Sequence, residues 1–222
     1  MSIPVSYAAE EGFYGSWTFF HTLIGLHGHS MLSLDSMVID PHDGGSIGLP
    51  KPSFNAKLTL VTHQHFDHDA VEVVGGKALV KYYGSTSLEG FRIVGVRGFH
   101  DKEKGRRRGE VAMYLVERND FKVVHLGDLG CLLNESQMKE LSSPDVLALP
   151  VGGVITIDWK EAADLVRALK PKAVIPLHYW VKGHLMPLDK VSPFLEELKW
   201  KTIQTRNVNE EELASQTIYL PF

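Results

Sequence analysis

An apolar stretch that ends in a cluster of potential metal ligands constrains this chain more than any other feature. Leu58–Val61 predicts a buried strand. The next residues read His-Gln-His-Phe-Asp-His, which places His63, His65, Asp67 and His68 within six positions. Side chains two apart in a strand face the same side, so His63 and His65 can hold one ion. Asp67 and His68 lie where the chain turns and can face a second ion. Imidazole and carboxylate bind zinc, manganese or iron, whereas a polar turn capped by Asp67 leaves three histidines unexplained.

Size and composition favour one globular domain. The chain has 222 residues, of which 44% are hydrophobic, enough for the core of a single domain spanning residues 1–222. A formal net charge of -4 argues against a nucleic-acid binder, which needs clustered positive charge. The one cysteine, Cys131, excludes an internal disulfide and fits a reducing compartment. No apolar run reaches the roughly 18 residues of a membrane span, and the N-terminus shows no basic leader. We therefore expect a soluble, cytoplasmic protein.

The ligand cluster resembles the signature of the metallo-β-lactamase superfamily, and the resemblance extends from about Gly28 to His178. Three later segments are similar to the remaining ligand motifs of that superfamily and come in its order: Gly98-Phe99-His100-Asp101, His125-Leu126-Gly127-Asp128-Leu129-Gly130 and Ile175-Pro176-Leu177-His178-Tyr179. Residues 149–153, Leu-Pro-Val-Gly-Gly, followed by Thr156-Ile157-Asp158, resemble a small-hydrolase branch that includes ascorbate-6-phosphate lactonase-like proteins.

Hydrophobic periodicity and turn residues predict a domain of mixed α and β structure. Strands are predicted at residues 17–23, 36–39, 58–61, 77–81, 91–96, 111–117, 122–125, 145–150 and 172–176, with a hairpin turn at Asn119-Asp120. Helices are predicted at residues 69–74, 134–141, 158–169 and 192–200, the third with Asp158 and Glu161 as a capping box. Short strands followed by interposed helices favour two packed sheets covered by helices. The resemblance implies an α+β fold, the four-layer αββα sandwich.

The resemblance also implies a set of ligands for two divalent ions, most readily zinc, with manganese or iron as alternatives. One ion would take His63, His65 and His100, the other Asp67, His68 and His178, and the carboxylate of Asp128 would bridge them. Asp67 and Asp128 would be catalytic, because two ions generate hydroxide near neutral pH and Asp67 can orient it. Taken singly, His100 could be a loop histidine, His178 a core histidine, and Asp128 a turn residue.

Further residues near these motifs are candidates for substrate contact or for support of the ligands. His29 lies in a Gly-His-Ser turn similar to that of the branch, His125 precedes Asp128 by three residues, and His184 lies in a glycine-containing loop. His21 and His42 are expected to be structural, and Cys131 to be a small buried thiol near the site. A basic cluster follows His100: Lys102, Lys104, Arg106, Arg107 and Arg108. It is either a solvated loop or a lip that attracts an anionic substrate, with Arg106 and Arg108 as contacts.

Together these features favour a metal-dependent hydrolase of a small ester, lactone, amide or phosphoester. A phosphodiesterase or nuclease of the same superfamily is the alternative within enzymes, although the acidic balance disfavours nucleic acid. The diiron oxygen-reducing branch typically has Glu where this chain has His65, which disfavours that chemistry. A non-catalytic metal-binding scaffold remains a further alternative. The expected partner is a small molecule rather than a membrane, an anionic one if the basic cluster is a lip, and a homo-oligomer is compatible with the sequence.

Overall fold

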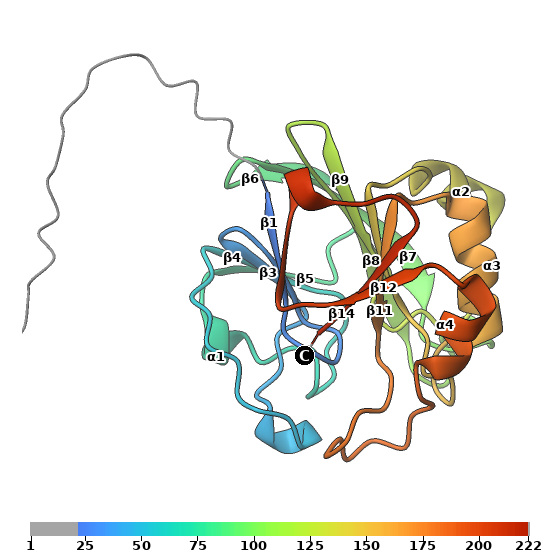
Figure 1. Ribbon diagram of the computed structural model, residues 1–222. Coiled ribbons are helices and arrows are strands. Elements are labelled where there is room, and N and C mark those ends of the chain that lie inside the picture. The colour runs from blue at the N-terminus through green and yellow to red at the C-terminus, as the bar shows by residue number, and fades with distance from the viewer. Residues whose placement is uncertain (1–21, 222) are drawn as a thin grey trace, which may run out of the picture.

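Two β-sheets face each other in the computed structural model, which describes residues 22–221 (Figure 1). The first sheet has the strand order β13 (Asn207–Asn209), β1 (Leu23–Leu26), β2 (Leu32–Leu34), β3 (Met37–Ile39), β4 (Leu58–Val61) and β5 (Lys77–Val80). The second has the order β12 (Lys201–Gln204), β14 (Thr217–Leu220), β11 (Ala173–Leu177), β10 (Val146–Pro150), β9 (Phe121–His125), β8 (Glu110–Arg118), β7 (Phe91–Phe99) and β6 (Gly84–Leu88).

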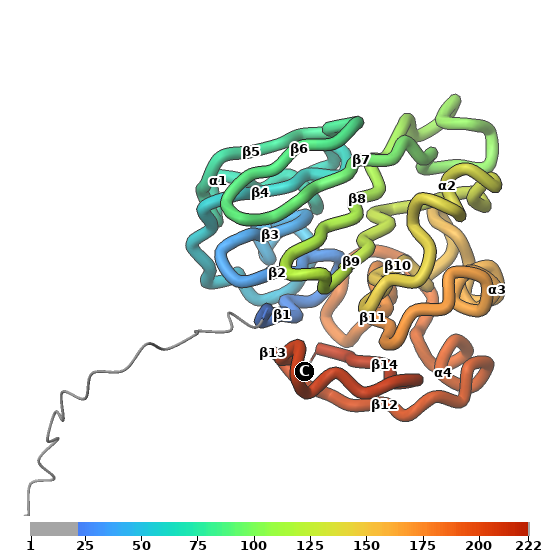
Figure 2. The backbone as a smooth tube through the Cα atoms, turned by 90° about the horizontal axis from the view of Figure 1, so that it is seen from above, coloured from blue at the N-terminus to red at the C-terminus, as the bar shows by residue number. Residues whose placement is uncertain are grey.

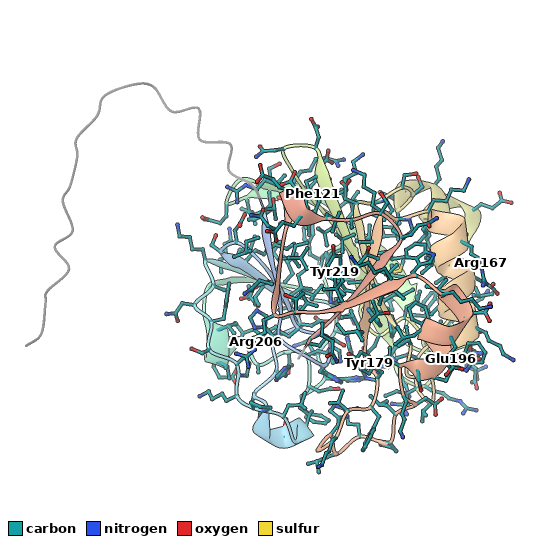
Figure 3. All side chains as sticks on the ribbon, viewed as in Figure 1. Phe121, Arg167, Tyr179, Glu196, Arg206 and Tyr219 are labelled. Atoms are coloured by element: carbon teal, nitrogen blue, oxygen red, sulfur yellow. The ribbon has the colours of Figure 1, made fainter. Side chains whose placement is uncertain are left out.

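Helices cover the outer face of the second sheet. Figure 2 shows α2 (Glu135–Glu140), α3 (Trp159–Leu169) and α4 (Ser192–Leu198) on the side away from the first sheet. Asp158 caps α3, and its carboxylate and that of Glu161 form the predicted capping box. An ion pair between Arg167 of α3, labelled in Figure 3, and Glu197 of α4 links the two helices on their exposed side.

The core lies between the sheets and continues under these helices. Strand β8 shows why, because Ala112, Tyr114 and Val116 face the first sheet while Met113 and Leu115 face the helices. A strand buried on both faces reads as a continuous apolar run rather than as an alternation. The first sheet contributes Leu58 and Leu60, among others, to the core between the sheets.

The outer face of the first sheet has a thinner cover. Helix α1 (Val71–Val74) and the segment at residues 54–56 pack there, with Met31, Val38 and Val74 forming a small buried cluster. The order of layers is therefore helix, sheet, sheet, helix, which confirms the αββα sandwich, with one outer layer reduced to a single helical turn. Two 3-10 turns, Gly45–Ile47 and Glu210–Glu212, complete the regular elements of the described chain.

Several strands differ from the prediction in length or were missed. Most of the strand predicted at residues 17–23 lies outside the described residues, and β1 runs from Leu23 to Leu26 instead. Five strands, β2, β6, β12, β13 and β14, were not predicted. Of these, β6 and β12 are short, polar edge strands with little apolar periodicity. The hairpin at Asn119-Asp120 is confirmed, since both residues have positive φ as a tight turn requires. In the described part of the chain, no helix has the length and apolar character to cross a bilayer.

Candidate metal centre

The candidate ligands lie just beyond the carboxyl ends of four strands. β9, β10 and β11 run parallel, and β7 runs the same way because it is antiparallel to β8, itself antiparallel to β9. His100 follows β7, Asp128 follows β9 and His178 follows β11, so all three reach one edge of the second sheet. The segment after β4 brings the His-x-His-x-Asp-His cluster to the same edge from the first sheet.

The carboxylate of Asp128 lies at the centre of the imidazoles. Its Oδ2 atom is 3.1 Å from Nε2 of His178 and 3.3 Å from Nε2 of both His68 and His100. Nε2 of His63 is 3.8 Å away. Four histidines from three separate segments therefore direct the same ring nitrogen at one carboxylate oxygen.

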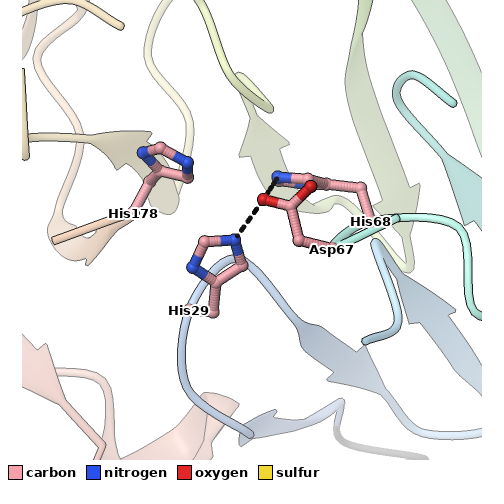
Figure 4. A group of neighbouring side chains, drawn as sticks. All are labelled: His29, Asp67, His68 and His178. Atoms are coloured by element: carbon pink, nitrogen blue, oxygen red, sulfur yellow. Dashed lines mark hydrogen bonds and ion pairs between the residues drawn. The ribbon is translucent and has the colours of Figure 1, made fainter. Parts of the chain in front are cut away.

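The described chain holds three groups of potential ligands, and two of them contain the predicted ligands other than Asp128, whereas the third, Asp40 with His63 and His68, overlaps both. The first ligand group contains His63, His65 and His100, and the second contains His29, Asp67, His68 and His178 (Figure 4). Within each group the ligand atoms lie within 4.8 Å of one another. The two groups bring together the residues predicted for each ion, and the second also contains His29, whose Nε2 atom lies 3.1 Å from Oδ2 of Asp67.

The donor set fits divalent metal ions. Nε2 atoms of His63, His68, His100 and His178 are buried and have no hydrogen-bond partner in the described chain, and neither has Oδ1 of Asp128. A buried polar atom without a partner costs roughly 1–3 kcal/mol. The four nitrogen atoms surround the Asp128 carboxylate, and all five atoms are accounted for when cations take their lone pairs. Nitrogen and oxygen donors of this kind suit zinc, iron or manganese.

The protonation states also suit metal binding. Burial lowers the pKa of both His63 and His178 to about 3, so their imidazoles are neutral with free lone pairs at neutral pH. Burial alone would raise the pKa of Asp67, but the hydrogen bond with His29 and the nearby ring of His68 outweigh it and hold the pKa below its usual range. His68 is the exception: burial opposes its charge, yet Asp128 and a second carboxylate raise its pKa well above 6.5.

That second carboxylate belongs to Asp40, which the sequence analysis missed. Asp40 is fully buried, and its Oδ2 atom accepts from Nδ1 of His68 at 3.0 Å and from Oγ1 of Thr62 at 2.7 Å. Its Oδ1 atom accepts from the backbone N–H of Thr62 at 2.7 Å. Thr62 Oγ1 lies 3.0 Å from Nδ1 of His63 and accepts from it. Asp40 therefore orients the ring of His68 directly and the ring of His63 through Thr62, so that Nε2 of each ring faces the metal centre.

The signal for Asp40 lies in the pairing of two strands rather than in a sequence motif. Asp40 directly follows β3, and β3 runs parallel to β4 as its immediate neighbour. Carboxyl ends of parallel neighbours reach the same edge of a sheet, so a carboxylate after β3 must lie close to the ligands after β4. His100 has a comparable support, since its Nδ1 atom donates to the carbonyl oxygen of Ile155 at 3.2 Å.

Two glycines, Gly130 in the Asp128 motif and Gly152 in the segment at residues 149–153, allow the chain to pass close to the backbone of two ligands. A Cβ atom on Gly130 would lie 2.4 Å from the carbonyl carbon of His100, and one on Gly152 would lie 2.0 Å from the carbonyl oxygen of His178. No side chain fits at those distances. These glycines therefore set where the backbones of His100 and His178 lie.

The remaining histidines have different surroundings. His125 is fully buried, its Nε2 atom donates to the Ser30 carbonyl at 2.9 Å, and its Nδ1 atom accepts from Gly127 N at 3.1 Å. Both ring nitrogens are engaged, so His125 supports the turn that carries Asp128. His184 is buried with its ring centroid 5.1 Å from that of His29, beside the second ligand group.

The cysteine and one further histidine lie outside both ligand groups. His42 is buried, with its ring 6.3 Å from that of His29. Cys131 is half-buried, and burial raises the pKa of its thiol. His21 lies outside the described residues.

The basic cluster forms a loop built around one carboxylate. Asp101 accepts from four backbone N–H groups, those of residues 103, 105, 107 and 108, at 2.8–3.0 Å. Arg107 pairs with Glu103 at 2.6 Å, and Lys102 with Glu161 at 2.8 Å. A cavity of about 730 Å³, here called the basic-loop pocket, lies beside this loop. Its lining includes His65, Asp101, Lys102, Glu103, Arg107 and Arg108. Arg106 is not among its lining residues, whereas Arg108 is.

Comparison with known proteins agrees with this geometry. Residues 27–178 match the profile of a family described as the β-lactamase superfamily domain. A metal-dependent hydrolase of Thermococcus onnurineus is 34% identical over 171 residues, covering 64% of this chain and 76% of its own length. A metal-dependent hydrolase of Pyrococcus horikoshii is 32% identical over 184 residues, covering 68% and 82%.

A solved structure is similar over nearly its whole length. This protein of Thermotoga maritima, assigned to the Zn-dependent hydrolases of the metallo-β-lactamase superfamily, aligns with a TM-score of 0.74 and 29% identity over 90% of this chain and 99% of that one. The chain belongs to the metallo-β-lactamase superfamily and is a metal-dependent hydrolase.

Proposed function

We propose that the protein is a dinuclear metallohydrolase of a small ester, lactone, amide or phosphoester. The observation that carries the proposal is the position of Asp128, whose Oδ2 atom lies within 3.1–3.8 Å of four imidazole Nε2 atoms from both sides. A carboxylate has two oxygens and can serve two ions. One ion alone would leave half of these nitrogens without a partner.

In this proposal each ligand group holds one ion. His63, His65 and His100 bind the first, and the second ligand group binds the other, with His29 as an additional ligand beyond Asp67, His68 and His178. Two divalent ions, most readily zinc, supply Lewis-acid polarisation of a carbonyl or phosphoryl oxygen and lower the pKa of water. Asp67 is held ionised, and its carboxylate oxygen that does not bind the ion can accept a hydrogen bond from a nucleophilic water and orient it.

The substrate reaches the first ion through the basic-loop pocket. His65 is the one member of the first ligand group that lines this pocket, and it is also the least buried of the three. Arg108 lies on the same lining and, unlike Arg107, has no ion pair within residues 22–221. Arg108 can therefore hold an anionic leaving group or a developing negative charge.

The test compares Asp128 with a buried histidine close by. Asp128→Ala should lower the zinc content from two equivalents to less than one and abolish hydrolysis of p-nitrophenyl acetate and bis-p-nitrophenyl phosphate. His125→Gln, three residues earlier, should retain both equivalents because His125 bonds only to backbone groups. Elemental analysis of protein purified without chelator gives the metal count. Two equivalents in Asp128→Ala would rule out the shared carboxylate.

A further inference from the structure

A second cavity adjoins the metal centre on the side of His29. This His29 pocket has a volume of about 590 Å³, and its lining includes the apolar side chains of Leu26, Leu49, Tyr179 and Val181. Arg206 and Tyr179, which both line it, lie in the lower half of the view in Figure 3. The ring of His29 belongs to this lining and to the second ligand group at once.

Three exposed cations surround this apolar lining. They are Lys51, Lys182 and Arg206, and no Asp or Glu among the described residues lines the pocket with them. None of the three forms an ion pair within residues 22–221. The basic-loop pocket differs, since Asp101 and Glu103 also line it. Uncompensated positive charge is therefore concentrated at the His29 pocket rather than at the basic loop, for which the sequence left open a solvated loop or a lip that attracts an anionic substrate.

His29 itself has an unused hydrogen-bonding group. Its Nε2 atom bonds to Asp67, and its Nδ1 atom, turned away from Asp67 in Figure 4, has no partner in the described chain although only 7% of the residue is exposed. A metal-bound histidine almost always donates its other N–H to an acceptor. His63 has Thr62 and His68 has Asp40 for this purpose. Nδ1 of His178 is also unpaired, but His178 does not line the pocket.

We propose that the His29 pocket binds the acidic part of the substrate, a carboxylate or phosphate group on a short apolar body. The apolar body lies on Leu26, Leu49 and Val181, and the oxyanion bonds to the surrounding cations. In the zinc-loaded protein Nε2 of His29 would bind the ion, so Nδ1 carries the proton. It donates to a substrate oxygen that lies between the apolar body and the bond to be hydrolysed. The proposal rests on the proposed function for the hydrolysed bond, but the binding of the oxyanion can be tested without catalysis.

The experiment measures binding of hexanoate, hexyl phosphate and hexanol to the zinc-loaded protein by titration calorimetry. Both anions should bind and hexanol should bind far more weakly. The double variant Lys182→Gln/Arg206→Gln should bind the anions roughly tenfold or more weakly, because a hydrogen bond to a charged group is worth about tenfold or more in affinity. The more tightly bound anion identifies the oxyanion as carboxylate or phosphate.

A matched double variant, Lys104→Gln/Arg106→Gln, removes the same two charge types from the basic loop, outside the lining of either pocket. It should bind the anions as the unmodified protein does. Equal weakening in both double variants would show a general charge effect and overturn the proposal. Unaltered anion binding in Lys182→Gln/Arg206→Gln would also overturn the proposal, because the anions would then bind the zinc ions directly. The proposal would likewise fail if the unmodified protein bound neither anion at millimolar concentrations.

Two further measurements separate this proposal from the proposed function. Zinc content should be equal in both double variants, because none of the four residues is a ligand. Zinc content and p-nitrophenyl acetate hydrolysis of the unmodified protein test the metallohydrolase itself. Loss of anion binding in Lys182→Gln/Arg206→Gln supports the pocket even if hydrolysis is absent, whereas active, zinc-loaded protein with unaltered anion binding contradicts the pocket alone.

Discussion

Replacement of Asp40 by Asn should weaken the second ion without touching any ligand. Oδ2 of Asp40 accepts from both Thr62 Oγ1 and His68 Nδ1, at 2.7 and 3.0 Å, in a fully buried position. In Asp40→Asn an N–H group replaces that acceptor if Oδ1 keeps its bond to the Thr62 backbone. The Thr62 hydroxyl can rotate to accept, but Nδ1 of His68 accepts only by moving its proton to Nε2, the atom that faces the metal centre.

The expected loss follows from this change of tautomer. Changes in groups that orient a metal-bound histidine typically cost 10–100-fold in metal affinity, or about 1.4–2.8 kcal/mol. Zinc competition with a chromophoric chelator should therefore show one weakened equivalent in Asp40→Asn while the other is nearly unchanged. Asp35→Asn is a matched control. Like Asp40, Asp35 has a positive φ near 50°, and its carboxylate forms an ion pair with Arg118 outside the metal centre. Equal zinc affinity in the two variants, both folded, would refute the role assigned to Asp40.

Three further outcomes follow from the geometry and the protonation states. Gly152→Ala should displace His178 and lower the zinc content, because a Cβ atom would lie 2.0 Å from the His178 carbonyl oxygen. Gly45→Ala, with open space around it, should leave the zinc content unchanged, and equal zinc content in the two variants would contradict the role of the close approach. His68 holds a proton in the metal-free protein because its pKa is raised, so zinc binding should release that proton and should tighten as pH rises toward that pKa. Calorimetry in buffers of different ionisation enthalpy measures the number of protons released, and no release near pH 6.5 would contradict the prediction. Cys131 should react slowly with iodoacetamide, with a rate still rising above pH 9 because burial raises the thiol pKa above its ordinary 9.0; a plateau below pH 9 would show a more acidic thiol.

The sequence predicted the centre of the site better than its surroundings. His63, His65, Asp67 and His68 are close in sequence, so their spacing alone indicates a metal site. Asp128 could be assigned only because its motif comes in a recognisable order between other motifs. Asp40 carries no such motif, and its role depends on the parallel pairing of β3 with β4, which a single sequence does not specify.

Pockets and paired charges were beyond the sequence for a related reason. The basic cluster looks like one surface feature in sequence, yet Glu103 and Glu161 neutralise two of its members. Lys51, Lys182 and Arg206 are far apart in the chain and come together only through the fold. Strand β8, with two buried faces, was predicted, whereas the polar edge strands β6 and β12 depend on their neighbours and were not. Strand β14 was missed although it is buried.

The central claim, two ions sharing Asp128, is tested most directly by anomalous diffraction at the zinc absorption edge from crystals of the zinc-loaded protein. The account predicts two anomalous peaks about 3.5–4 Å apart, one within each ligand group and both within bonding distance of the Asp128 carboxylate. A single peak at saturating zinc, or a second peak remote from Asp128, would contradict it.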